Sequence, residues 1–269
     1  MEYTNPAKFY WGNLTWVEIK EAIAQQRVIL MPIGATEQHG RHLPLNTDNF
    51  IANHLCLHVA QKIPEEVLIL PVVPFAFNQH HLDFPGTIAI KWQNILGYLI
   101  DVVESVAYHG FKRMIFVSGH GVNPPYMAVV ANEVNTRFDA LCVSFVWTAL
   151  LGDISDIRES EFPGGMAHAC ELETSVFLYL DQERVRQEEI VKEMSFENSS
   201  WLWMDLVKPS PLHLGEMWWS SFSKTGVAGD ATLATAEKGQ ALFERATENF
   251  IQLIREFRAR ELPIREDFH

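Results

Sequence analysis

The chain has 269 residues, of which 48% are hydrophobic, and 34 acidic against 21 basic side chains give a formal net charge of −13 at pH 7. This length and composition suffice for one large core, so we expect residues 1–269 to form a single domain. The excess of negative charge argues against nucleic acid and against anionic membrane surfaces as partners, because both attract basic proteins.

Cysteine usage and the N-terminal segment bear on the compartment. The three cysteines, Cys56, Cys142 and Cys170, are odd in number and widely spaced, which indicates neither a disulfide framework nor a thiolate zinc site. Residues 1–16 lack the basic and then apolar pattern of a secretion signal, and no stretch approaches the roughly 20 apolar residues of a membrane span. We therefore expect a soluble, cytoplasmic protein.

Short apolar runs alternate with amphipathic segments along the chain. Helical spacing occurs in residues 16–26, 48–63, 95–109, 126–138, 171–180 and 234–261. Apolar runs typical of buried strands occupy residues 28–33, 68–74, 113–118 and 141–147, the last of which ends at Trp147. Strands separated by helices predict βαβ units, so the expected fold class is α/β, a mainly parallel sheet sandwiched between helices.

Side chains that can bind metal follow two of these predicted strands. The loop after residues 28–33 carries Glu37, His39, His42 and Asp48, and His120 lies between two glycines directly after residues 113–118. Carboxylates and imidazoles together suit zinc, manganese or iron. Because ligands of parallel sheets bind beyond the carboxyl ends of the strands, we expect both loops to meet at one edge.

Two further segments contain candidate site residues. His168, Glu171 and Glu173 follow a flexible Pro-Gly-Gly sequence and open the predicted helix 171–180. Asn78, His80, His81 and Asp83 follow the strand 68–74, and either reach the same crevice or form an ordinary hydrogen-bonded loop. Taken alone, a histidine in such a loop is more often structural than catalytic. The hypothesis of a metal site therefore rests on the combination of these segments with the two loops described above.

Several short blocks occur in a fixed order along the chain. They are residues 32–40, 42–45 and 47–48, then Gly119-His120-Gly121 with Asn123, then His168 with Glu171, Glu173, Thr174 and Ser175. Together they resemble the signature blocks of the creatininase (creatinine amidohydrolase) family over residues 28–180. The resemblance implies a three-layer α/β fold, a homohexamer and a site for two divalent metal ions, zinc or manganese with iron in some relatives.

The resemblance also implies roles for individual residues. Glu37, Asp48 and His120 would hold one ion, and His39 and Asp48 the other, with Asp48 bridging. Creatininase has a glutamate where this chain has Val122. Members of the His-Gly-x-Asn type instead carry an additional glutamate in the later block, and the chain resembles this type rather than creatininase itself. We therefore expect Glu171 as the fifth ligand.

Other residues are assigned supporting or catalytic roles. His168 matches a histidine that assists proton transfer in creatininase, but Gly164 stands where creatininase has a tryptophan, so creatinine is not the expected substrate. Residues expected to orient ligands or contact substrate are Gln38, His42, His80, Asn123, Glu173 and Trp147. The irregular stretch 199–229, with Trp201, Trp203, Trp218, Trp219, His213 and Lys224, is interpreted as a lid or a subunit interface.

These assignments predict a metal-dependent hydrolase that uses a water activated by two ions on a small cyclic amide or cyclic carbonyl compound. By resemblance, the wider family includes creatinine hydrolysis, trimming of a peptide cofactor precursor and ring opening of a keto-inositol by C–C cleavage. Two alternatives stay open at this point. One is the C–C ring-opening reaction, and the other is a non-catalytic structural or regulatory member of the family.

Overall fold

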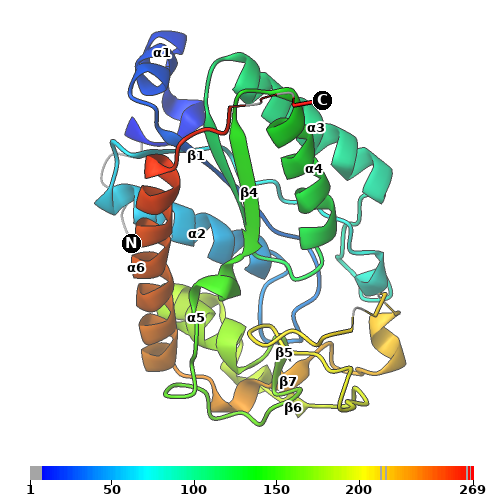
Figure 1. Ribbon diagram of the computed structural model, residues 1–269. Coiled ribbons are helices and arrows are strands. Elements are labelled where there is room, and N and C mark those ends of the chain that lie inside the picture. The colour runs from blue at the N-terminus through cyan, green and yellow to red at the C-terminus, as the bar shows by residue number, and fades with distance from the viewer. Residues whose placement is uncertain (1–7, 213, 216, 265, 267) are drawn as a thin grey trace.

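A four-stranded parallel sheet in the order β2-β1-β3-β4 forms the centre of the molecule (Figure 1). The structure is a computed structural model that describes residues 8–212, 214–215, 217–264, 266 and 268–269. The strands are β1 (Val28–Ile33), β2 (Val67–Ile69), β3 (Arg113–Ser118) and β4 (Leu141–Val146). Every residue of β1 and β3 is buried, which is why both read as apolar runs without alternation.

Helices cover both faces of this sheet. One layer contains α1 (Trp16–Ala24), α3 (Trp92–Tyr108) and α4 (Pro124–Arg137), and the other contains α2 (Thr47–Lys62), α5 (Glu171–Asp181) and α6 (Ala236–Ala259). Alternate residues of β1 point to opposite layers: Ile29 packs in the cluster that includes α3 and α4, and Leu30 in the cluster that includes α2 and α6. The predicted three-layer α/β architecture is confirmed.

The connections place the carboxyl ends of β1 and β3 side by side. From β1 the chain crosses through α2 to β2 on one side, whereas β3 and β4 lie on the other side of β1. The register pairs Ile33 with Ser118, the last residues of the two strands. The loops that carry Glu37 and His120 therefore start next to each other, at the point where open α/β sheets bind ligands.

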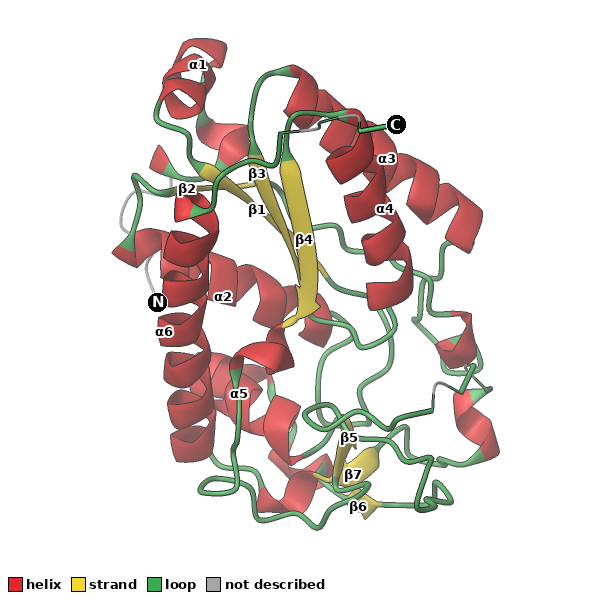
Figure 2. Ribbon diagram, viewed as in Figure 1, coloured by secondary structure: helices red, strands yellow, loops and turns green. Residues whose placement is uncertain are grey.

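A second, three-stranded antiparallel sheet lies beyond this edge (Figure 2). Its order is β5-β7-β6, from β5 (Met166–His168), β7 (Ala228–Asp230) and β6 (Lys192–Glu193). Strands of two or three residues give no periodic signal, so the sequence did not predict them. The sheet matters for the site because His168 is the last residue of β5.

Several predicted boundaries shift in the structure. The predicted strand 68–74 shortens to β2, since Pro71 and Pro74 interrupt regular pairing and only Val73 makes an isolated bridge to Ile33. Helix α3 starts at Trp92, and α4 starts at Pro124, a favoured residue for a first turn.

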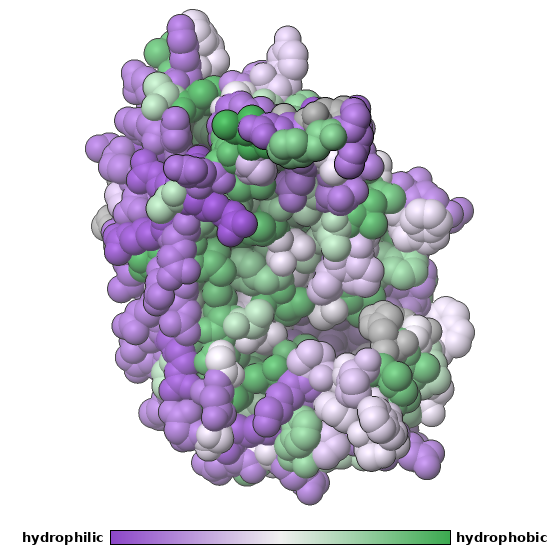
Figure 3. Space-filling model, in the orientation of Figure 1, coloured by the Kyte–Doolittle hydropathy of each residue, from purple (hydrophilic) through white to green (hydrophobic). Residues whose placement is uncertain are grey.

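Helix α6 packs its apolar face against the core through residues such as Phe250, whereas hydrophilic side chains dominate the outer surface along this helix (Figure 3). In the described chain, short 3₁₀ helices complete the structure: η2 (Trp11–Asn13), η3 (Gln79–His81), η4 (Trp147–Leu150), η5 (Gln182–Arg184), η6 (Gln187–Glu189), η7 (Trp219–Ser221) and η8 (Ala231–Leu233).

Among the described residues, no helix combines the length and apolarity needed to cross a membrane. Two parts of the sequence-based interpretation, residues 1–7 of the N-terminal segment and His213 of the stretch 199–229, lie outside the described residues.

Candidate metal centre

Glu37, Asp48 and His120 meet in the interior, at the carboxyl ends of β1 and β3. The Nδ1 atom of His120 lies 3.1 Å from Glu37 Oε1 and 3.2 Å from Asp48 Oδ2. All three residues are buried. Three donors from two loops and the start of α2 thus converge on one small volume, as the spacing of the loops predicted.

The second oxygen of Asp48 faces a different histidine. Asp48 Oδ1 lies 3.0 Å from His39 Nε2, and Glu173 Oε1 lies 4.0 Å from the same nitrogen. His39 Nδ1 is 3.2 Å from the backbone oxygen of Glu37, which can only accept, so Nδ1 carries the hydrogen. The Nε2 lone pair then points at a carboxylate, an arrangement that needs a proton or a metal cation between the two atoms.

The start of α2 lies close to the end of β3 because residue 119 is glycine. Asp48 belongs to the first turn of α2, where the helix dipole favours a negative charge. A Cβ added to Gly119 would lie 2.1 Å from the backbone oxygen of Asp48. The absence of that atom allows Asp48 and His120 to reach each other.

The electrostatics of the cluster call for positive charge. Three buried carboxylates, those of Glu37, Asp48 and Glu173, lie together, and within the described chain their ion-pair partners are histidines alone. Burial raises the pKa of Glu173 to about 7. Burial acts to lower the pKa of His39, but the Asp48 carboxylate outweighs it and raises that pKa to about 9. Without metal, the cluster therefore holds protons where cations could bind.

Buried polar atoms without hydrogen bonds provide a direct test of whether a cation fits. Glu37 Oε1, Asp48 Oδ2 and His120 Nε2 are buried and have no hydrogen-bond partner among the described residues. Buried polar groups are normally satisfied, and unsatisfied ones commonly mark a missing ion or water. Side chains with metal-ligand spacing include Glu37 with His39 and Asp48, and His39 with His168 and Glu173. The residues present fit divalent cations.

Gln38 fixes the hydrogen positions on His81 and His168. Nε2 of His168 lies 2.7 Å from the backbone oxygen of Gln38, so Nε2 must carry the hydrogen. The side-chain amide of Gln38 then gives its two hydrogens to His81 Nδ1 at 2.9 Å and to the Gly226 oxygen at 3.0 Å. Its own oxygen accepts from the Gly40 amide at 2.9 Å, which agrees with this orientation.

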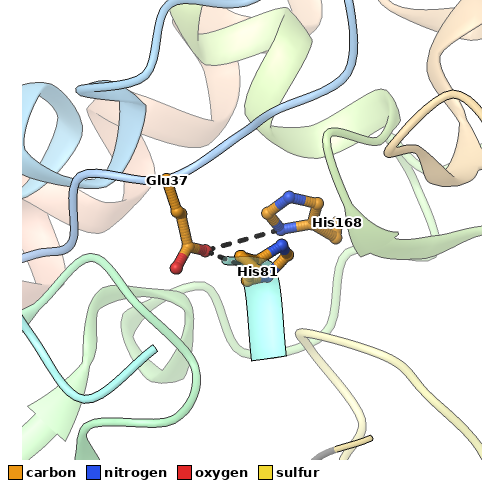
Figure 4. A group of neighbouring side chains, drawn as sticks. All are labelled: Glu37, His81 and His168. Carbon is orange, nitrogen blue, oxygen red and sulfur yellow. Dashed lines mark ion pairs between the residues drawn. The ribbon is translucent and has the colours of Figure 1, made fainter. Parts of the chain in front are cut away.

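These tautomers determine what each ring presents to Glu37. Nδ1 of His168 is unprotonated and lies 4.0 Å from Glu37 Oε1, whereas Nε2 of His81 carries a hydrogen and lies 3.4 Å from the same oxygen (Figure 4). Burial, reinforced by neighbouring histidines, holds the pKa of both rings well below its usual range. Each ring is therefore neutral near pH 7, and His168 offers a proton acceptor at the cluster.

A cavity of about 230 Å³ opens over the cluster. Asp48, His120, His168 and Glu173 line its inner end. Its outer wall comes from the tryptophan-rich stretch, including Leu202, Trp203, Leu206, Met217 and Trp219. The ring of Trp219 lies against His168 and His81, with centroids 4.8 and 4.4 Å apart. This stretch therefore covers the site of its own chain, as expected for a lid.

Comparison with known proteins identifies the family. The family model for creatininase (creatinine amidohydrolase) matches residues 12–254. The chain belongs to the creatininase family. It is 30% identical over 236 residues to the mycofactocin precursor peptide peptidase of Mycobacterium tuberculosis, an alignment that covers 84% of each protein. It is 28% identical over 281 residues to the 3-dehydro-scyllo-inosose hydrolase of Thermotoga maritima, covering 96% of this chain and 88% of that protein.

The fold of the family is also shared at the structural level. A solved structure described as "Creatininase Mn" superposes with a TM-score of 0.79 at 23% identity, covering 93% of this chain and 98% of that chain. The named relatives are hydrolases by their descriptions, and this chain is a creatininase-family hydrolase.

The structure corrects the choice between the two glutamates at the start of α5. Glu171 faces away from the cluster and accepts hydrogen bonds from the backbone amides of Glu159 and Ser160 and from Lys238 Nζ, at 3.1, 2.9 and 2.6 Å. Residues two apart on a helix project about 200° apart, so only one of them can point at the cluster. That residue is Glu173, and the prediction of Glu171 as the fifth ligand is wrong.

The loop between β2 and α3 reaches the site, which decides between the two interpretations that the sequence left open. Asn78 Nδ2 donates to Glu37 Oε2 at 3.1 Å, and His81 contacts the other oxygen of Glu37. His80 lines the cavity, and burial lowers its pKa to about 3, so it is neutral. Asp83 instead accepts from the Ser220 amide, and therefore connects this loop to η7.

Three other predicted residues lie near the cluster or in the core. His42 Nε2 is 2.9 Å from Thr174 Oγ1 on α5. Asn123 donates to the Gly34 oxygen and to Ser118 Oγ, at 3.2 and 3.0 Å, and so joins the ends of β1 and β3. Trp147 is buried among the side chains of the core and lines neither described cavity, so its position does not support the expected role in orienting ligands or contacting substrate.

Proposed function

We propose that this creatininase-family hydrolase binds two divalent cations and cleaves a C–N bond of a small amide or related carbonyl compound. The observation that carries the proposal is the position of Asp48, whose two oxygens face two different donor groups. Glu37, Asp48 and His120 would hold one cation, and His39, Asp48 and Glu173 the other. When bound, such a pair lowers the pKa of a water molecule towards neutrality and polarises a substrate carbonyl.

The donor set bears on the choice of metal. Carboxylate oxygens and imidazole nitrogens surround the site, and the three cysteines of the chain are buried and free. This combination suits zinc, manganese or iron. The similar creatininase structure described as a manganese form supports a transition metal. Three carboxylates give a charge of about −3, which two divalent cations would compensate.

His168 is the residue best placed to move protons. Its Nδ1 atom is unprotonated and faces the cluster, because Nε2 is committed to the backbone of Gln38. It can accept a proton from the attacking water and pass it to the leaving nitrogen, as general acid–base catalysis requires. Asn78 donates to Glu37 Oε2 and fixes the orientation of that carboxylate, whereas His81 Nε2 lies 3.4 Å from Oε1 without a hydrogen bond.

The relatives support two classes of bond. One relative is described as a peptidase, which breaks a C–N bond, and the other as an inosose hydrolase. The inosose hydrolase aligns with 96% of this chain, so C–C cleavage of a cyclic ketone is the second candidate. The complete set of donors argues against a non-catalytic member, since a site without function is free to lose ligands.

Metal analysis and a substrate screen test this proposal. Protein purified without chelators is expected to hold about two transition ions per chain, because the proposed chemistry needs both. Creatinine, cyclic amides, short peptides and keto-inositols are then compared with the wild type, Asp48→Asn and His168→Ala. Less than about one ion per chain, not restored by zinc or manganese, would contradict the proposal. Cleavage confined to keto-inositols would favour the second candidate.

A further inference from the structure

A second and larger cavity lies directly beside the metal centre. This apolar groove, of about 990 Å³, is lined by side chains that include Phe77, Trp92, Leu96, Val129 and Trp218. His80, Val122, Gly215 and Met217 line both the groove and the 230 Å³ cavity over the cluster. The two spaces therefore share a wall.

The groove exposes large apolar side chains to water. Trp92, Val129 and Trp218 have 52%, 46% and 57% of their surface exposed. In Figure 3, apolar side chains gather on the surface over η7. Clustered exposed apolar surface on a protein marks a binding site more often than chance. The described lining contains no Asp, Glu, Lys or Arg, which disfavours a charged occupant.

We infer that the apolar groove binds an apolar group of the enzyme's own substrate while the scissile carbonyl lies at the metal centre. The inference rests on the proposed function and deepens it. The substrate class is an amide or peptide-like carbonyl compound that carries an aromatic or branched aliphatic group. The adjacency of the two spaces supports this occupant, because a substrate group that extended beyond His80 and Val122 would reach the groove.

Val122 lies at the boundary between the two spaces. In this chain an apolar side chain lines both. Met217 is a second apolar side chain that lines both spaces, and His80 of η3, which also lines both, is buried. The boundary therefore favours an apolar group passing across it.

Two hydroxamic acids can test this inference. The hydroxamate group binds divalent metals, so binding can be measured without turnover. Zinc-loaded protein is titrated calorimetrically with acetohydroxamate and with 3-phenylpropanohydroxamate. Burial of the phenyl group in the groove is expected to strengthen binding by about tenfold or more. Val129→Asp and Trp92→Ala should remove this gain and leave acetohydroxamate binding unchanged. Trp201→Ala is the matched control, because Trp201 is exposed and lines neither cavity.

The outcomes separate this inference from the proposed function. If acetohydroxamate does not bind zinc-loaded wild type, the metal centre itself is contradicted and the inference falls with it. If acetohydroxamate binds and the phenyl group adds no affinity, the proposed function stands and the inference is overturned. If the phenyl group adds nothing and Val129→Asp changes the mass measured by light scattering, the groove is instead a contact between copies of the chain.

Discussion

The backbone oxygen of Gln38 accepts a hydrogen bond from Nε2 of His168 at 2.7 Å. This one contact decides which nitrogen of the ring faces the metal centre. The side chain of Gln38 adds a second constraint, because it donates to His81 and to the carbonyl of Gly226. A single loop residue thus sets the protonation pattern of two histidines at the candidate site.

Replacement of Gln38 by leucine should weaken the site without removing a ligand. His81 loses the donor to its Nδ1 atom, and among the described residues the Gly226 carbonyl keeps the Trp219 indole, which donates to it at 2.8 Å. Loss of such a supporting group costs about 10–100-fold in metal affinity or activity. Zinc affinity measured with a competing indicator checks this prediction. An unchanged affinity and an unchanged rate would show that Gln38 only packs there.

Glu171→Gln and Glu173→Gln form a matched pair, two residues apart on the same helix. Glu173→Gln replaces a proposed ligand. Its metal affinity should therefore fall by more than about 10–100-fold, which is the cost of losing a supporting group. Glu171→Gln should keep the metal content of the wild type, since its carboxylate bonds to Lys238 and to the backbone at Ser160. Elemental analysis of both proteins decides between them. The reverse pattern would restore the sequence-based assignment.

Glu171 should instead contribute to stability in a pH-dependent way. Hydrogen bonds from Lys238 and Ser160 outweigh burial and hold the pKa of Glu171 below its ordinary value of 4.5. A lowered folded-state pKa stabilises the folded protein above pH 4.5, and this contribution is lost as the pH falls through the folded-state pKa. Glu171→Gln is expected to lower the free energy of unfolding by about 1–3 kcal/mol at pH 7. Urea unfolding should show this difference shrinking towards low pH.

Metal binding should weaken as the pH falls. Without metal, the pKa of His39 is raised to about 9 and that of Glu173 to about 7, so both groups retain protons near neutrality. A cation must displace these protons, and protonation therefore competes with binding. Zinc affinity is expected to rise from pH 6 to pH 9, with proton release detected by calorimetry in buffers of different ionisation enthalpy. A pH-independent affinity would contradict this picture.

Gly119→Ala should disrupt the centre through the backbone. The added Cβ would lie 2.1 Å from the Asp48 oxygen, so α2 must move away from the end of β3. We expect loss of metal and a lower free energy of unfolding by more than about 3 kcal/mol, as for severe overpacking. Gly97→Ala is the control, since a Cβ at that position in α3 meets nothing within 4 Å. It should stabilise the helix by up to about 1 kcal/mol.

Most of the fold and four of the proposed metal ligands could be predicted from the sequence. Buried strands such as β1 and β3 are continuous apolar runs, and parallel topology brings the loops after them to the same edge. The pattern of strands and loops therefore suffices to place Glu37 and His120 together. The resemblance of the short sequence blocks to the family then implied which of the surrounding residues would share the two ions.

The errors have local causes. Glu171 and Glu173 differ by a rotation about the axis of α5, and the sequence does not show which of the two faces the sheet edge. Lys238, which forms an ion pair with Glu171, lies far from it in the sequence, on α6. The orienting role of Gln38 depends on its hydrogen bond to Gly226, which is also distant in the sequence. The two residues meet because the chain returns to the site just before β7. Contacts between such distant segments leave no spacing pattern in one sequence.

The small antiparallel sheet has a consequence for biosynthesis. His168 ends β5, and β5 pairs with β7, which follows the tryptophan-rich stretch and Gly226. A nascent chain therefore cannot pair β5 and hold His168 in place until β7 has left the ribosome, even though Glu37 and Asp48 emerge early. The order of synthesis thus separates the two parts of the proposed site: all five proposed ligands precede β7, whereas the histidine proposed to move protons is held in place only after β7 has been made.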